Sequence, residues 1–480
     1  MRTKNTIPMT SLVVLAAMPA VALGSVWQLA ERSDAPAGEP VPTTPDPPPP
    51  VDELATNLIS PRRHPAPIAD RIAAAEQQAL TEALADDLSG LLGDGMCVTI
   101  RRSDDLILDI GGEQALIPAS NMKVLVAAVA LDVLGPEYRF RTELRSAPPN
   151  GSVVTGDVYV TGGGDPVLVS ADHVDPARYP AINTTPLDTL IDQLVTIGIT
   201  RIDGDIVGDA TRYDDEFRVP SWGDDITNAD AGPYDALLIN DGLLDNGDFG
   251  LVPAQSAANI VIDEIEARGI DVTGSSRHAA PPDGLELTTL ALVESQPLTE
   301  VLVELLHTSD NTTAEMIIKE IGFQQSGQGT RPAGAAAIAA RLADWGISTA
   351  PLVLDDGSGL SRQNRLTCDA LSLVVAAAPV AEQLWDLLPV AGRDGTLAEQ
   401  LVGTAAEGEM QAKTGTLTGV KALTGVLDGA DDEPVQFAMI LNGEGVNEPD
   451  VYQAYWLELV ELIGAYPIVV EPRVDRFDPR

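Results

Sequence analysis

The chain has 480 residues, of which 44% are apolar, enough for one large domain with an insertion or for two to three domains. Its 72 acidic side chains outnumber the 29 basic ones, and the formal net charge is −43. Because a phosphate backbone would be repelled rather than neutralised, this charge argues strongly against nucleic acid as a partner.

The first 31 residues have the pattern of a targeting segment. Arg2 and Lys4 precede an uncharged stretch from Asn5 to Ala30, which is most apolar over Leu12–Leu23. This pattern fits a cleaved signal peptide and an uncleaved membrane anchor equally well. In both cases we expect the remainder to be exported to the cell envelope or the outer side of the cytoplasmic membrane.

Residues 32–65 form a proline-rich linker. From Ser33 to Asp52 the chain is rich in Pro, Ala, Asp and Thr, and it includes four consecutive prolines at 47–50. Such a composition cannot form a core and predicts an extended spacer, which would hold a folded domain away from a membrane or wall.

Ordered structure is predicted from the end of this linker onward. Apolar residues recur at helical spacing over 68–92, and two strands at 97–100 and 106–108 follow. A helix is predicted from 118 through 128, and the region of about 146–296 is rich in glycine, aspartate and short strands. Together with an apolar C-terminal helix, this mixture indicates an α/β or α+β fold.

Cys97 and Cys368 are the only cysteines. In an oxidising compartment they could pair, and the pair would constrain the unfolded chain; two buried thiols are an equal alternative. Neither belongs to a C-x-x-C motif, so neither a zinc site nor a redox site is indicated.

Three short motifs carry residues suited to acyl transfer. Ser120 and Lys123 lie three positions apart at the start of a predicted helix, where the amine can reach and activate the hydroxyl. Taken alone, this spacing is more often a helix cap followed by a surface lysine.

The second motif, Ser309-Asp310-Asn311, is by itself common as a helix cap. The third, Lys413-Thr414-Gly415-Thr416, is rarer and precedes a predicted strand at 417–423. Its lysine and threonines can bind a carboxylate, and its glycine permits close approach of a ligand to the backbone.

The order S-x-x-K, S-x-N, K-T-G is the motif set of class A β-lactamases and penicillin-binding proteins. The chain resembles this superfamily, and in particular the low-molecular-mass class C penicillin-binding proteins, the D-alanyl-D-alanine carboxypeptidases/endopeptidases. Further matching segments are 164–166, 309–315, 356–362 and 392–397, and the resemblance extends from about residue 66 almost to the C-terminus.

The resemblance implies an antiparallel sheet flanked by helices, with an inserted smaller domain. The transpeptidase-like catalytic domain would comprise 66–145 and 297–480, and the insertion 146–296. With 189 positions between Ser120 and Ser309, one inserted domain fits, and the nested second insertion of larger members is absent or reduced.

The resemblance also implies roles for individual residues. Ser120 would be acylated by the penultimate D-alanine, with Lys123 as the base, made neutral by burial and by the second cation at Lys413. Ser309 would relay a proton and Asn311 would hold the substrate amide. Five further positions complete the implied site: Lys413, Thr414, Gly415 and Thr416 at the terminal carboxylate and oxyanion hole, and Arg362 beside the stem peptide.

The implied activity is that of an exported serine DD-peptidase acting on peptidoglycan stem peptides and acylated by β-lactam antibiotics. No cofactor or metal is expected, and the four scattered histidines support neither a zinc site nor a Ser-His-Asp triad. A serine β-lactamase or esterase with the same fold, and a catalytically silent wall-binding protein, remain alternatives. The hypothesis requires one small cavity in which the Ser120 hydroxyl touches the amines of Lys123 and Lys413 and the amide of Asn311.

Overall fold

The computed structural model describes residues 93–173, 181–223, 226, 230–244 and 246–467. The predicted targeting segment, the proline-rich linker and the predicted helix at 68–92 lie outside these residues. Within the described part of the chain, no helix combines the length and the apolar character needed to cross a bilayer.

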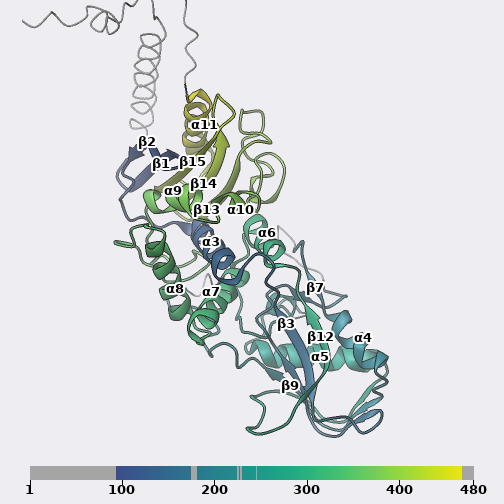
Figure 1. The fold of residues 1–480 in the computed structure, drawn as a ribbon. Coiled ribbons are helices and arrows are strands. Elements are labelled where there is room, and N and C mark those ends of the chain that lie inside the picture. Colours follow the sequence, from purple (N-terminus) through teal and green to yellow (C-terminus); the bar gives the residue numbers. More distant parts are fainter. Residues whose placement is uncertain (1–92, 174–180, 224–225, 227–229, 245, 468–480) are drawn as a thin grey trace, which may run out of the picture. The chain divides into compact units, whose positions relative to one another are not determined.

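A five-stranded antiparallel sheet forms the centre of the first group of elements (Figure 1). Its strand order is β13-β14-β15-β1-β2, so a strand near the start of the described chain pairs with one near its end. This leaves β13 at one edge of the sheet. The strands are β1 (Met96–Arg102), β2 (Asp105–Ile110), β13 (Gln411–Leu417), β14 (Val420–Asp428) and β15 (Pro434–Asn442).

Helices cover both faces of this sheet, because side chains alternate between faces along each strand. Val98 and Phe437 pack in one core with Trp456 of helix α11 (Pro449–Ala465). Ile440 and its neighbours on the opposite face pack in another core with helices α3 (Met122–Leu134) and α9 (Cys368–Ala377). The predicted antiparallel sheet flanked by helices is therefore confirmed.

The remaining elements of this group are helical. Helix α3 is fully buried along most of its length and is preceded by a short 3₁₀ turn, η1. The other elements are η1 (Ala119–Asn121), α6 (Leu298–Thr308), α7 (Asn311–Ser326), α8 (Arg331–Asp344), α10 (Ala381–Trp385) and η3 (Gly395–Leu397).

A disulfide joins Cys97 of β1 to Cys368 at the first position of α9. It ties the central sheet to a helix 271 positions further along the chain. The alternative that the sequence left open is thereby resolved in favour of pairing.

A second five-stranded sheet, of order β11-β9-β5-β3-β12, is built from the glycine- and aspartate-rich region. Its β3–β5 and β3–β12 pairs are antiparallel, whereas β9 runs parallel to both of its neighbours. Helices α4 (Leu187–Thr196) and α5 (Pro253–Ala267) pack against it in a separate core. The strands are β3 (Arg141–Ser146), β5 (Val158–Thr161), β9 (Ile206–Asp209), β11 (Ser276–His278) and β12 (Thr288–Glu294).

Smaller elements complete this region. A three-stranded parallel sheet has the order β10-β8-β4, and β6 pairs with β7. Their bounds are β4 (Val153–Val154), β6 (Leu168–Val169), β7 (Thr185–Pro186), β8 (Arg201–Ile202), β10 (Asp271–Val272) and η2 (Asn240–Gly242). We propose that the elements from β3 to β12 form the inserted domain; the boundaries 146 and 296 stay a prediction.

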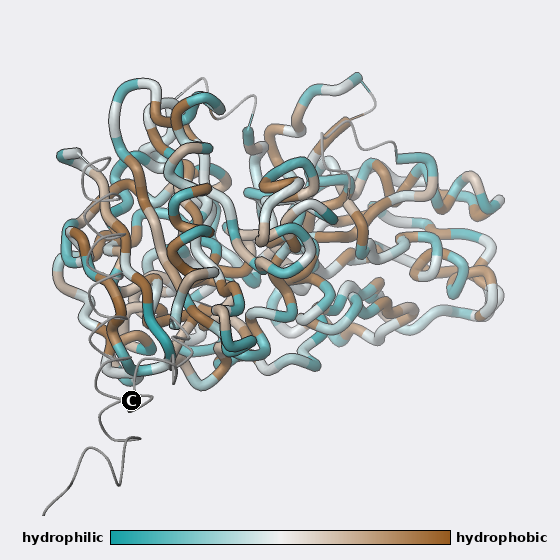
Figure 2. Tube along the Cα trace, turned by 90° about the horizontal axis from the view of Figure 1, so that it is seen from above, coloured by the Kyte–Doolittle hydropathy of each residue, from teal (hydrophilic) through white to brown (hydrophobic). Residues whose placement is uncertain are grey.

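Apolar residues, brown in Figure 2, lie mainly along strands and helices, and polar residues prevail in many connecting loops. One sequence prediction is wrong in detail. The expected strand at 417–423 is divided by a turn at Thr418-Gly419, and the third motif lies inside β13 instead of preceding a strand. Gly419 has φ +72°, a conformation that suits a two-residue hairpin loop and that a strand does not use.

Candidate active site

Ser120 lies in the 3₁₀ turn that immediately precedes α3, and the regular α-helix begins two residues later, at Met122. The preceding residue, Ala119, is fully buried and has φ +47°. A non-glycine residue in this left-handed region costs on the order of 1–3 kcal/mol and persists only where its surroundings enforce it. The strained turn presents the half-buried Ser120 at the end of a rigid, buried helix.

Lys123 is fully buried in the first turn of α3. Its amine donates hydrogen bonds to Ser120 Oγ at 3.2 Å, Asn311 Oδ1 at 2.8 Å and the Ser358 carbonyl at 2.7 Å. These three acceptors use all three N–H bonds of an ammonium group. When the amine is neutral, its lone pair becomes available to accept the proton of the Ser120 hydroxyl.

Burial lowers the pKa of Lys123 to about 8, because desolvation penalises the charged form. The charge of Asp310, that of Asp356 and, when it is ionised, that of Glu315 oppose this shift and keep the pKa of Lys123 from falling further. Burial also lowers the pKa of Lys413, and repulsion from Lys123 and Lys421 lowers it again. Burial is therefore the main cause of the lowered pKa of Lys123. A neighbouring cation contributes to the lowered pKa of Lys413 instead.

Ser309 and Asn311 lie at the junction of α6 and α7. Ser309 ends α6 in the left-handed conformation, with φ +64°, and Asp310 caps α7 by accepting a hydrogen bond from the Thr313 backbone N–H. Asn311 accepts from Lys123 through its oxygen and donates through its nitrogen to the Asp230 carbonyl at 2.7 Å. The motif therefore caps α7 and also brings Asn311 to Lys123, whereas the catalytic roles of Ser309 and Asn311 stay predictions.

Lys413 is fully buried on the edge strand β13. Its amine donates to Ser309 Oγ and to the Thr414 carbonyl, both at 3.0 Å. Its own carbonyl accepts from Asn121 Nδ2 at 3.2 Å, which joins the strand to η1. Among the hydrogen bonds of the described residues, Lys413 therefore reaches Ser309, and Lys123 alone of the two amines reaches Ser120.

Gly415 explains why the strand can approach the serine turn so closely. A Cβ atom at this position would lie 2.7 Å from the Pro118 carbonyl oxygen and 2.9 Å from Asn121 Nδ2. Any side chain would push β13 away from η1. The close approach at this glycine is made by the protein's own η1 segment, and the close approach of a ligand stays a prediction.

The other proposed binding residues lie around the same strand. Thr414 donates to Thr396 Oγ1 at 2.8 Å, and Thr416 is exposed. Arg362 is also exposed and donates to the Thr418 carbonyl in the turn after β13. Its guanidinium therefore lies beyond the end of the strand, at the rim of the cluster.

The loop at 356–361 closes the side of the site behind Lys123. Asp356 is fully buried and accepts from the backbone N–H groups of Gly359 and Ser361. Trp222, which belongs to the proposed insertion, also donates to this carboxylate, at 2.9 Å. Trp222 therefore helps to hold in place the loop whose Ser358 carbonyl contacts the Lys123 amine.

Glu315 supports the same loop from α7. It is fully buried, and its Oε1 accepts from the backbone N–H groups of Gly357 and Ser358 at 3.0 and 2.7 Å. Its Oε2 has no hydrogen-bond partner among the described residues. Burial, and to a smaller extent the Asp356 charge, raise the pKa of Glu315 to about 8, so this carboxyl is mostly protonated at neutral pH.

Sequence reasoning gave no role to several residues that complete this arrangement, namely Asn121, Glu315, Ser358, Thr396 and Lys421. The first four lie within motifs that carried the family resemblance. Lys421, however, stands outside every motif. Its only signal was that it is one of five lysines in the chain.

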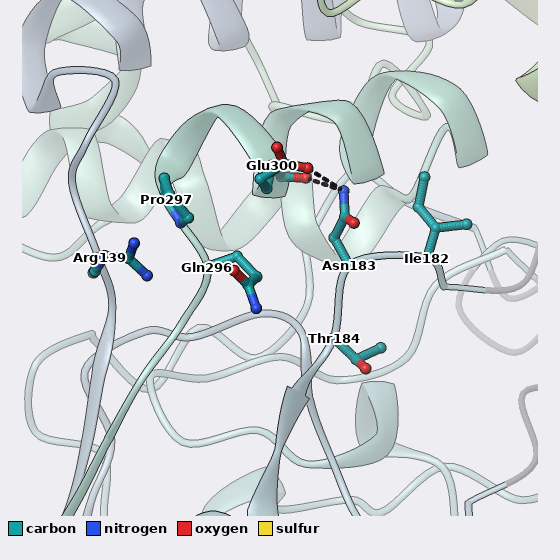
Figure 3. A pocket seen from close by; sticks show the side chains of 7 residues that line it. All are labelled: Arg139, Ile182, Asn183, Thr184, Gln296, Pro297 and Glu300. Carbon is teal, nitrogen blue, oxygen red and sulfur yellow. Dashed lines mark hydrogen bonds between the residues drawn. The ribbon is translucent and has the colours of Figure 1, made fainter.

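A cavity of about 540 Å³ opens beside the first turn of α6 (Figure 3). Asn183 points toward Glu300 across its wall and donates to its carboxylate at 3.1 Å, while Arg139 lies on the opposite side. None of the predicted site residues lines this cavity. The hydrogen bonds among Ser120, Lys123, Ser309, Asn311 and Lys413 therefore identify the candidate active site, and this cavity lies outside it.

The family model described as the D-Ala-D-Ala carboxypeptidase 3 (S13) family matches residues 76–247 and 251–460. The chain belongs to this family. As a member of the S13 family it is a serine-type D-Ala-D-Ala carboxypeptidase, as predicted.

Curated relatives agree with this assignment. The S13 chain is 32% identical over 461 residues to the D-alanyl-D-alanine carboxypeptidase of Actinomadura sp. (strain R39), with 78% of this chain and 82% of the relative covered. It is 31% identical over 400 residues to a carboxypeptidase of Mycobacterium tuberculosis, covering 79% and 83% of the two chains.

The fold of the S13 chain is similar to that of penicillin binding protein 4 from Haemophilus influenzae. The TM-score is 0.69 at 22% sequence identity, and the match covers 79% of this chain and 99% of the other. At this identity the likeness speaks to the fold alone. It confirms the predicted penicillin-binding-protein fold.

Proposed function

We propose that this S13 member hydrolyses the D-Ala-D-Ala bond, or the D-Ala-diamino-acid bond, of peptidoglycan stem peptides through an acyl-enzyme on Ser120. The single observation that carries this proposal is the set of hydrogen bonds from the buried Lys123 amine to Ser120, Asn311 and the Ser358 carbonyl. A buried amine with a lowered pKa beside a hydroxyl is an activated-nucleophile arrangement.

In the proposed acylation step, neutral Lys123 takes the Ser120 proton as Oγ attacks the penultimate D-alanine carbonyl. The backbone N–H groups of Ser120 and Thr416 stabilise the oxyanion that forms. The proton then passes through Ser309, which hydrogen-bonds to Lys413, to the leaving amine, and D-alanine departs. Water completes the reaction by attacking the ester, and the Ser120 hydroxyl is restored.

We also propose that the protein acts outside the cytoplasmic membrane and that β-lactams acylate the same serine. The Cys97–Cys368 disulfide supports an oxidising location, since such bonds are rare in the cytosol. The charge pattern of the first 31 residues supports export, and it fits both a signal peptide that is cleaved and a membrane anchor that is retained.

The proposal is tested with a stem pentapeptide ending in D-Ala-D-Ala, with released D-alanine measured by mass spectrometry. A cross-linked dimer of stem peptides, assayed in parallel, reports endopeptidase activity. Ser120→Ala should release no D-alanine, whereas Ser348→Ala, at an exposed serine whose hydroxyl only contacts the Ala350 carbonyl, should match the wild type. Equal release by the wild type and Ser120→Ala contradicts the proposal.

A further inference from the structure

Lys421 is a buried cation that the proposed reaction does not use. It lies on β14, next to the edge strand, and only 8% of its surface is exposed. In a chain with 72 acidic residues, no carboxylate of the described residues forms an ion pair with it. A buried charge without a counter-ion is costly, so its retention calls for an explanation.

The surroundings of Lys421 hold its amine in one place. The amine lies 4.0 Å from the ring centre of Tyr452 and 4.9 Å from that of Trp456, both on α11. Tyr452 is itself fixed through its hydroxyl, which donates to Gln400 at 3.1 Å. Cation–π contacts of this kind stabilise an ammonium group while leaving its N–H bonds free for other partners.

One of those N–H bonds is directed at Thr416. The Lys421 amine donates to Thr416 Oγ1 at 2.9 Å, and the two residues are directly paired across β13 and β14. A hydroxyl that accepts from an ammonium group must direct its own proton elsewhere. Since Thr416 is exposed on the edge strand, that proton is available to an anion approaching the edge.

The side chains of Lys413 and Lys421 lie on opposite faces of the sheet formed by β13 and β14. Lys413 and Gly415 face η1 and α7, whereas Thr414 and Thr416 face the other side with Lys421. Lys421 is close enough to lower the pKa of Lys413, so the positive charge of both acts on the same end of β13. Burial lowers the pKa of Lys421 to about 8, which leaves it mostly charged at neutral pH.

We propose that Lys421 is a positioning residue that makes the site selective for substrates ending in a carboxylate, acting through the Thr416 hydroxyl. This inference rests on the proposed function, because it assumes that the leaving group occupies the end of β13 beside Ser120. It adds a second lysine, from outside the three motifs, to Lys413 in the recognition of the terminal carboxylate.

The test compares two acyl-D-alanyl thioesters that differ only in the leaving group. One leaving group ends in a carboxylate and the other in the corresponding neutral amide. Lys421→Met should lower kcat/KM for the carboxylate thioester by about 10- to 100-fold, the range expected for a lost charge-assisted hydrogen bond, and mainly through KM. Its kcat/KM for the neutral thioester should stay within about threefold of the wild type, and Lys421→Arg should restore most of the selectivity.

The neutral thioester serves as the folding control in the same experiment. Equal losses on both thioesters would assign Lys421 a purely structural role, and unchanged selectivity would remove it from recognition; either outcome overturns the inference. In a Thr416→Val background, Lys421→Met should have little further effect, and full additivity would contradict action through Thr416. A wild-type protein that hydrolyses neither thioester would instead overturn the proposed function itself.

Discussion

The amine of Lys123 and the side-chain oxygen of Asn311 lie 2.8 Å apart, although 188 positions separate the two residues in the chain. The neutral amide accepts a hydrogen bond here without adding a negative charge. A carboxylate at the same position would stabilise the protonated amine and withhold the base from Ser120.

Asn311→Asp is therefore expected to raise the pKa of Lys123 and to move the acidic limb of the acylation profile upward by about one to three pH units. Asp310→Asn is the matched control: it retains a capping oxygen for α7 and removes a charge that raises the pKa of Lys123, so the limb should move downward. Stopped-flow acylation across pH 5–10 measures both shifts. Movement of both variants in the same direction would contradict this electrostatic account.

The pH dependence of the wild type follows from the same amine. Only neutral Lys123 can accept the proton, and its neutral fraction rises with pH and reaches one half at the pKa of about 8. With an uncharged thioester, kcat/KM should rise about tenfold per unit below pH 7.5 and level off above about pH 8.5. A profile that is flat from pH 6 to 9 would exclude Lys123 as the base.

We expect Glu315, in its protonated and uncharged form, to stabilise the loop at 357–358. Glu315→Gln keeps an oxygen for the Gly357 and Ser358 N–H groups, so its unfolding free energy at about pH 4, where the carboxyl is mostly protonated in both the folded and the unfolded chain, should stay within about 1 kcal/mol of the wild type. Glu315→Ala leaves both N–H groups without this acceptor and should cost at least about 2 kcal/mol. Denaturant titrations of the three proteins measure these differences.

The sign of the pH effect gives a second check on Glu315. Because its folded-state pKa of about 8 lies above its ordinary value of 4.5, the unfolded chain loses this proton first, and the contribution to stability falls as pH rises from about 4.5 to 8. Glu315→Gln should therefore gain stability relative to the wild type between pH 5 and 8. A constant difference over this range would show that the carboxyl is ionised in the folded protein.

The disulfide should contribute to stability through the long loop that it closes. Reduction, or the double substitution Cys97→Ala/Cys368→Ala, is expected to lower the unfolding free energy by about 2–4 kcal/mol. Acylation of Ser120 at 25 °C should be little changed, since neither sulfur contacts the cluster. Calorimetry with and without reductant tests the first statement, and an unchanged melting temperature would contradict it.

The sequence predicted the elements that depend on local pattern. Helix α3 and the strands at 97–100 and 106–108 follow from apolar periodicity, and spacing alone brings Lys123 to Ser120. The turn at Thr418-Gly419 was missed because the apolar residues on either side read as one continuous strand.

Contacts between distant segments were not predictable in the same way. Glu315 reaches the loop at 357–358 and Lys421 reaches Thr416 only after tertiary folding, and one sequence does not reveal which polar groups will be buried. The main cause of the Lys123 pKa shift, burial, likewise depends on packing around α3 and not on the charge pattern. Trp222 lies 134 positions from the carboxylate that it holds, so its role also emerges only in the folded chain.

The most direct test of the account is the covalent labelling of Ser120 by penicillin. We predict that labelled penicillin forms a stable adduct with the wild type, that peptide mapping places the label on Ser120, and that Ser120→Ala remains unlabelled. Rapid turnover of the adduct would favour a β-lactamase. An unlabelled wild type, or a Ser120→Ala variant that is still labelled, would contradict the central claim.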